Sequence, residues 1–171
     1  MSRWKKIGAW ILAVLLIFLL FAIWYKQNYS MKVAEPYEVN SPSHKDHILI
    51  ATQGSEFKDS LVHELVRELR TQSVFIKVID ISDLTTIKED EWTAIILLHT
   101  WENWEPQEDA KYFIEQVKDK RKLIVLSTSG QGSYRIEDID GITSASKLSD
   151  VSDKAKEITS RVTKLLWEEN K

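Results

Sequence analysis

The stretch 93-TAIILLHT-100 decides the fold class of this chain. Its apolar residues, 94–98, follow one another without a polar interruption. This pattern lacks both the alternation of a half-exposed strand and the spacing of an amphipathic helix. A run this short and this apolar is typical of a strand that is covered on both faces. We therefore expect 93–100 to be an inner strand of a parallel sheet.

Segments with strand and helix patterns alternate on both sides of this run. The expected strands are 47–52, 73–81, 93–100, 122–130 and, at the edge of the sheet, 135–143. The expected helices are 55–70, 106–120 and 149–169, with a short helical turn at 87–92. This order predicts an α/β fold, with an open, mostly parallel sheet and helices on both faces.

The helix expected at 55–70 begins with clear signals. Ser55 is a plausible N-cap residue, and Glu56 and Asp59 lie in the first turn, where the helix dipole favours carboxylates. The apolar residues recur at helical spacing and form one face. They are Phe57, Leu61, Val62, Leu65, Val66 and Leu69.

A long apolar segment precedes these elements. Residues 7–24, IGAWILAVLLIFLLFAIW, carry no charge, and as a helix they would span about 27 Å of the roughly 30 Å bilayer core. Trp4, Trp10, Trp24 and Tyr25 lie toward its ends, where aromatic rings favour the interface. The alternative is a cleaved signal peptide, which has a shorter apolar region and a small-residue cleavage site. We expect 7–24 to be a retained transmembrane helix.

Flanking charges predict the orientation of this helix. Arg3, Lys5 and Lys6 precede it, whereas only Lys26 and Lys32 follow it over a similar distance. The positive-inside rule then places the N-terminus in the cytoplasm and the remainder outside the cell membrane. The expected division is a cytoplasmic N-terminus at 1–6, the transmembrane helix at 7–24, a linker at 25–45 and a folded domain at 46–171.

Composition and missing motifs narrow the function classes. The chain has 171 residues, a net charge of −3 and no cysteine. Balanced charge gives no support for nucleic-acid binding, and the lack of cysteine excludes disulfides and a cysteine nucleophile. No G-x-x-x-x-G-K-[ST] loop and no G-x-S-x-G elbow is present, which argues against a phosphoryl-transfer ATPase and a serine hydrolase. We assign no catalytic residue and no metal ligand, and leave enzymatic activity open.

Three polar stretches follow expected strands. They are 52-TQGSEFKDS-60, 99-HTWENWEP-106 and 127-STSGQGSYR-135. In an open α/β sheet, ligands bind outside the carboxyl ends of the strands, where the strand order reverses. These stretches are therefore the candidate ligand site.

This layout resembles the flavodoxin-like fold over residues 46–171. The resemblance implies FMN as a cofactor, with its phosphate in the loop after the first strand. The loops after the third and fourth strands would flank the flavin ring. Gly54, Ser55 and Ser60 stand at the phosphate-loop positions, and Trp101 and Trp104 stand in the loop that covers the ring.

The phosphate loop departs from the hydroxyl- and glycine-rich run, such as T-x-T-G-x-T, that is usual in flavodoxin-like proteins. Here the loop has one glycine and two acids, Glu56 and Asp59, which would repel a phosphate. Lys58 is the only nearby cation in this stretch.

The stretch 140-DGITSAS-146 resembles a short signal for covalent flavin attachment, roughly D-G-x-[ST]-G-A-T, which extracytoplasmic flavin-binding domains use. The resemblance implies a phosphodiester bond between the flavin phosphate and the Ser146 hydroxyl. Ser144 replaces the usual glycine, and Ser146 replaces the commoner threonine. The alternative is a turn in which Ser144 or Ser146 hydrogen-bonds backbone groups before the last helix.

His99 ends the strand 93–100 beside Trp101, at the expected mouth of the site. There it could hydrogen-bond a ligand or act as a general acid. The alternative is a buried histidine whose hydrogen bonds are satisfied within the fold.

Two functions stay open at this stage. The first is a membrane-anchored flavodoxin-like protein that binds FMN and carries electrons to a redox partner at the membrane. The second is a cofactor-free domain of the same fold, anchored in the lipid bilayer to present an interaction surface to a membrane partner. Fold alone does not choose between them. The expected cofactor contacts are Thr52, Gly54, Ser55, Ser60, His99, Trp101, Trp104, Ser127, Thr128, Gly130, Gly132 and Ser146.

Overall fold

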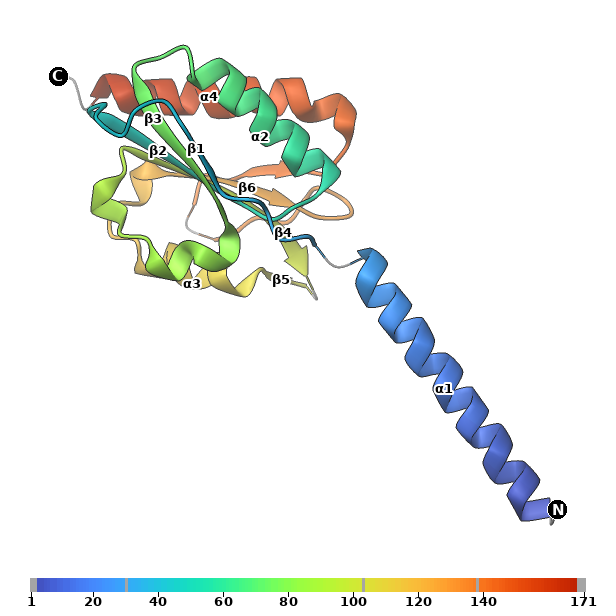
Figure 1. Ribbon diagram of the computed structural model, residues 1–171. Helices are drawn as coiled ribbons and strands as arrows, with labels where there is room; N and C mark the ends of the chain where they lie inside the picture. The colour runs from blue at the N-terminus through green and yellow to red at the C-terminus, as the bar shows by residue number, and fades with distance from the viewer. Residues whose placement is uncertain (1–2, 30, 103, 138, 169–171) are drawn as a thin grey trace. The chain divides into compact units, whose positions relative to one another are not determined.

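The computed structural model of the chain describes residues 3–29, 31–102, 104–137 and 139–168. The chain forms two compact units, Met1–Met31 and Lys32–Lys171. Each unit is described here by itself (Figure 1).

The first unit is a single long helix. Helix α1 spans Arg3–Tyr29, and its part Arg3–Trp24 is long and apolar enough to cross a membrane. None of the residues in this apolar window is buried against other protein. A signal sequence near the N-terminus can also pass this test of length and composition. The helix expected at 7–24 is present, and its role in a membrane stays a prediction.

A mostly parallel sheet forms the centre of the second unit. The parallel strands are β2 (Asp46–Thr52), β3 (Val74–Asp80), β4 (Ala94–Glu102), β6 (Leu123–Thr128) and β7 (Ile142–Ser144). Strand β1 (Tyr37–Val39) pairs antiparallel with β3, so the order across the sheet is β1-β3-β2-β4-β6-β7. A two-residue strand, β5 (Glu105–Pro106), folds back on the end of β4.

Helices cover both faces of this sheet. Helices α2 (Glu56–Leu69) and α4 (Val151–Glu168) lie together on one face, and α3 (Glu108–Gln116) lies on the other (Figure 1). The connection from β3 to β4 contains only two 3₁₀ turns, η1 (Ile81–Thr86) and η2 (Glu89–Glu91). Two further 3₁₀ turns, η3 (Lys120–Lys122) and η4 (Leu148–Asp150), precede β6 and α4.

The alternation of side chains along each strand explains the continuous apolar runs. In β4, Ile96 and Leu98 pack into the core beneath α2 and α4, whereas Ile95 and Leu97 pack into the core beneath α3. All four side chains are fully buried. Burial of each such side chain stabilises the fold by about 1.5–3 kcal/mol relative to exposure. The α/β class and the doubly covered inner strand at 93–100 are therefore confirmed.

The sheet begins earlier in the chain than the sequence indicates. The expected linker, 25–45, contains β1, whose Glu38 lies opposite Lys77 of β3. Lys32 also pairs with Gly54 in an isolated bridge. The boundary expected at residue 46 thus lies too late, because β1 has only three residues and no alternation to mark it.

The other boundaries shift by smaller amounts. Helix α3 begins at Glu108 because Pro106 belongs to β5 and the Gln107 side chain provides the N-cap. The edge strand expected at 135–143 is the shorter β7, which pairs in parallel with β6. Trp101 belongs to the extended β4, whereas we expected it in a loop.

Candidate functional site

The order of the strands along the chain reverses between β2 and β4, which is the switch point of the sheet. The chain passes from β2 to β3 on one side, and then crosses to β4 on the other side of β2. At such a point the connections leave in opposite directions, so the carboxyl ends of the two strands carry the residues that can meet a ligand. Thr52 is the last residue of β2 and Thr128 is the last residue of β6. Thr100 lies between them near the end of β4.

A buried lysine occupies this edge. Lys58 lies in the first turn of α2, and only 1% of its surface is exposed. Its Nζ donates to Thr100 Oγ1 at 2.5 Å, and Thr100 Oγ1 lies 3.0 Å from Thr128 Oγ1. Burial lowers the pKa of Lys58 to about 8, against the opposing effect of the Glu102 and Asp59 carboxylates. Lys58, the cation of the expected phosphate loop, thus directs its ammonium toward Thr100 and is buried.

Gln53 links β2 to the end of β4. Its Oε1 accepts from the Thr100 amide at 2.7 Å, and its Nε2 donates to Glu102 Oε1 at 3.1 Å. Gln53 is itself buried. Together with the Lys58 contacts, these bonds hold the strand ends in one arrangement, because buried polar groups are costly to leave unpaired.

His99 lies beneath the site rather than at its mouth. Its side chain is fully buried, and its Nε2 lies 2.7 Å from Ser127 Oγ. Burial lowers the pKa of His99 to about 4, so the imidazole is neutral at pH 7. The alternative of a satisfied buried histidine describes His99, and its expected contact with a ligand is not met.

Gly54, in the loop after β2, has both of its backbone groups engaged. The Gly54 amide donates to the Lys32 carbonyl at 2.7 Å, and the Lys32 amide donates to the Gly54 carbonyl at 3.0 Å. A Cβ at Gly54 would lie 2.7 Å from the Lys32 oxygen, which shows how closely the two segments approach. The neighbouring Ala34 amide donates to Asp80 Oδ2 at 2.7 Å.

The hydroxyls expected to hold a phosphate also have partners or lie elsewhere. Ser55 Oγ accepts from the Lys58 amide at 3.3 Å as the N-cap of α2, and Thr52 Oγ1 donates to the Gln53 carbonyl at 3.2 Å. Ser60 is half-buried one turn into α2. With the Gly54 amide paired, this loop does not fit the phosphate of FMN in the arrangement seen here.

Three aromatic rings gather at the end of β4. The ring of Tyr134 lies 5.1 Å from that of Trp101 and 6.1 Å from that of Trp104, measured between centroids. Trp104 is 81% exposed, and its backbone φ of 70° belongs to the left-handed region. The Trp101 Nε1 is buried and has no hydrogen-bond acceptor among the described residues. Tyr134 was not among the expected contacts, although it lies in the polar stretch 127–135.

The loops after β6 and β7 pack against each other. The Ser129 amide donates to the Ser144 carbonyl at 3.1 Å, and Gly132 adopts a φ of +65°. A Cβ at Gly132 would lie 2.6 Å from the Ala145 nitrogen. Gly130 is exposed and has open space around it. Glycine is therefore needed at position 132 but not at position 130.

Ser146 lies in a turn of the kind we named as the alternative. Its amide donates to Ser144 Oγ at 3.1 Å, its φ is 57°, and the residue is exposed. Ser127 and Thr128, by contrast, are buried at the end of β6 and bond to neighbouring strand residues. Thr52 and Thr128 thus lie at the same edge of the sheet, at the carboxyl ends of β2 and β6, whereas Ser146 lies on the surface.

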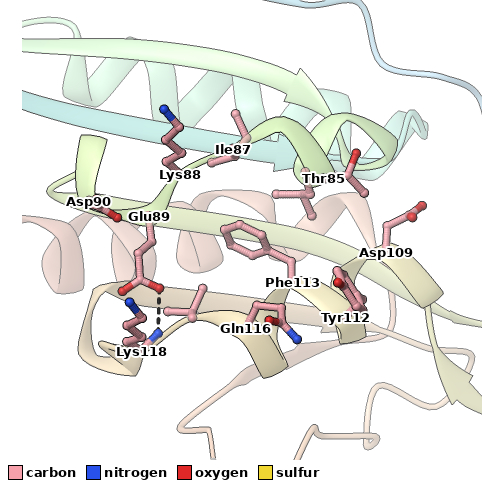
Figure 2. A pocket seen from close by; sticks show the side chains of 12 residues that line it. Thr85, Ile87, Lys88, Glu89, Asp90, Asp109, Tyr112, Phe113, Gln116 and Lys118 are labelled. Carbon is pink, nitrogen blue, oxygen red and sulfur yellow. Dashed lines mark hydrogen bonds between the residues drawn. The ribbon is translucent and has the colours of Figure 1, made fainter.

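A separate hollow lies between η1, η2 and α3 (Figure 2). Its volume is about 250 Å³, with Leu84, Phe113 and Val117 on its apolar side. Glu89 closes one end, where its carboxylate accepts from the Lys118 amide at 2.7 Å (Figure 2). The hollow lies where two 3₁₀ turns, rather than a helix, connect β3 to β4. Its lining includes none of the residues that bond around Lys58 at the strand ends.

Comparisons with known proteins give little further guidance. No protein-family model matches the chain, and no curated protein matches it in sequence. A solved structure of an oxidoreductase from Corynebacterium diphtheriae is similar at 11% identity and a TM-score of 0.48, covering 74% of this chain and 99% of that chain. A similarity at this level carries no information on function.

Proposed function

We propose that this chain is a membrane-anchored, cofactor-free α/β domain that binds a partner protein through the strand ends around Trp104. The five parallel strands, numbered along the chain, lie in the order 2-1-3-4-5. This is the order of flavodoxin-like sheets, in which the ligand site lies between the first and third strands. The strand order supports a flavodoxin-like architecture and a functional surface at this edge.

The pairing of Gly54 with Lys32 is the observation that carries the cofactor-free proposal. A phosphate is held by backbone N–H groups that point at it from a loop and a helix N-terminus. Here the Gly54 amide already donates to Lys32, and the Ser55 hydroxyl already caps α2. Lys58, which could attract an anion, is turned toward Thr100.

Helix α1 supports the anchored state. Its apolar part, Arg3–Trp24, has the length of a bilayer span. The basic residues Arg3, Lys5 and Lys6 favour a cytoplasmic N-terminus and an extracytoplasmic domain. Such a domain would meet partners at the membrane surface.

The experiment is a flavin titration of the full chain purified in detergent. We expect a colourless protein as purified, and no change in FMN fluorescence on addition of the protein. A Lys32→Pro variant, which keeps the carbonyl that accepts from the Gly54 amide but loses the N–H that donates to the Gly54 carbonyl, serves as the comparison with a weakened pairing. Tight FMN binding by the unaltered chain would refute the cofactor-free proposal.

The second candidate, an FMN-binding electron carrier, is favoured by one observation. The buried Trp101 Nε1 has no acceptor among the described residues, and it lies beside the exposed rings of Trp104 and Tyr134. A flavin would supply hydrogen-bond acceptors and a planar ring, and its redox chemistry would be its own. Retention of flavin after acid precipitation, with loss in Ser146→Ala, would favour covalent attachment at Ser146.

A further inference from the structure

The hairpin at the end of β4 carries an unusual combination of charge and exposed aromatic surface. Strands β4 and β5 pair Trp101 with Pro106 and Glu102 with Glu105. Directly opposed like charges destabilise an antiparallel pair. Both glutamates are exposed, and neither has an ion-pair partner among the described residues. The hairpin therefore places two exposed carboxylates opposite each other, with the buried Lys58 near Glu102 as the nearby positive charge and no ion pair to Glu105 among the described residues.

The indole of Trp104 stands beside these carboxylates. It is 81% exposed, and among the described residues its ring meets that of Tyr134 edge-on, at 6.1 Å and 79°. A solvent-exposed tryptophan face attracts a lysine or arginine side chain through its quadrupole, and tryptophan is the best ring for this.

Glu102 is fixed rather than freely mobile. Its Oε1 accepts from Gln53 Nε2 at 3.1 Å, and Gln53 is held in turn by the Thr100 amide at 2.7 Å. The hydrogen bonds of Gln53 thus hold the Glu102 carboxylate in place. A preorganised carboxylate loses less conformational entropy on binding than a free side chain.

We propose that the hairpin of Trp104, Glu102 and Glu105 binds a cationic segment of the partner protein, rich in arginine or lysine. This proposal rests on the proposed function, since it names the chemistry of the partner at the same surface. An arginine side chain fits this hairpin best, because its planar guanidinium stacks on indole and bonds two carboxylates at once. An anionic membrane surface is disfavoured as the occupant, because the two carboxylates would be repelled by it.

The test uses the full chain in detergent and an oligo-arginine peptide, with a glycine–serine peptide and an oligo-glutamate peptide as controls. Isothermal titration gives the affinity at low and at raised salt. We expect binding of the arginine peptide only, with an affinity that falls as salt is raised. Trp104→Ala should weaken this binding by about two- to fivefold, the size of an exposed cation–π contact.

Matched variants distinguish binding at the hairpin from non-specific attraction of the arginine peptide to acidic residues elsewhere on the chain. Glu105→Gln should weaken binding of the arginine peptide, whereas Glu115→Gln on the exposed side of α3 should leave it unchanged. Trp167→Ala provides the control for Trp104, because Trp167 is 71% exposed on α4. All four residues are exposed, so the variants are expected to fold, which circular dichroism checks.

The outcomes distinguish the two proposals. Equal loss of binding in Glu105→Gln and Glu115→Gln, or no loss in Trp104→Ala, would overturn the hairpin assignment. Binding of vesicles with anionic lipids in preference to the arginine peptide would overturn it as well. Tight FMN binding would instead overturn the cofactor-free function, whatever the peptides show.

Discussion

The buried Lys58 should make the free energy of unfolding of this domain increase with pH in the alkaline range. Burial lowers its pKa from the ordinary value of 10.5 to about 8. Between these two values the unfolded chain keeps a proton that the folded chain has lost. Folding stability therefore rises with pH across the window from about 8 to 10.5, because the unfolded state binds more protons.

The size of this effect follows from the same two values. Each tenfold change in proton affinity corresponds to about 1.4 kcal/mol, so the window contributes about 3 kcal/mol. A Lys58→Met variant keeps the length of the side chain and removes the titration. The difference in unfolding free energy between the unaltered chain and the variant should therefore change by about 3 kcal/mol between pH 7 and pH 11.

Urea denaturation of the full chain in detergent measures this difference, with the transition followed by circular dichroism. Comparison with the variant cancels the titration of other groups, including Tyr37, whose pKa burial raises. Lys156→Met, at an exposed position of α4, is the matched control and should show no such change. Parallel pH profiles of the unaltered chain and Lys58→Met would show that Lys58 titrates as an ordinary lysine, and would refute the reasoning.

Three further changes test the packing around the site. The pKa of His99 is about 4 in the folded chain and 6.5 in the unfolded chain, so the free energy of unfolding should fall as the pH drops below 6.5, by about 2 kcal/mol at pH 5. Urea titrations of His99→Gln should lack this loss. Gly132→Ala should destabilise the domain by about 1–3 kcal/mol because its φ is +65°, whereas Gly130→Ala, with open space around it, should leave the melting temperature unchanged. Gly54→Ala should separate the loop after β2 from Lys32, because the new Cβ would lie 2.7 Å from its carbonyl oxygen, and faster proteolysis near residue 32 would report this.

The sequence predicts the main features of the sheet because burial leaves a direct trace in it. The continuous apolar run 94–98 indicates a strand covered on both faces, and the structure divides that run between two cores. Strand β1 leaves no such trace. Its three residues have no periodicity, and its pairing with β3 joins residues about 40 positions apart in the chain.

The buried position of Lys58 in the candidate site could also be predicted from the sequence. Lys58 lies three, four and seven residues before Leu61, Val62 and Leu65, which is the spacing of one helical face. That spacing indicates that the lysine points inward, as the structure shows. The pairing of Gly54 with Lys32 could not be predicted, because it depends on where the segment before the sheet happens to lie.

The sheet ends in very short strands at both described edges, β1 with three residues and β7 with three. Open edge strands act as templates for pairing with other chains, and this tendency grows with the length of the unpaired backbone. Anchoring in a bilayer, as proposed, would confine many copies to two dimensions and raise their frequency of collision. With so little backbone offered for lateral pairing, neighbouring copies could be crowded together without joining into a continuous sheet.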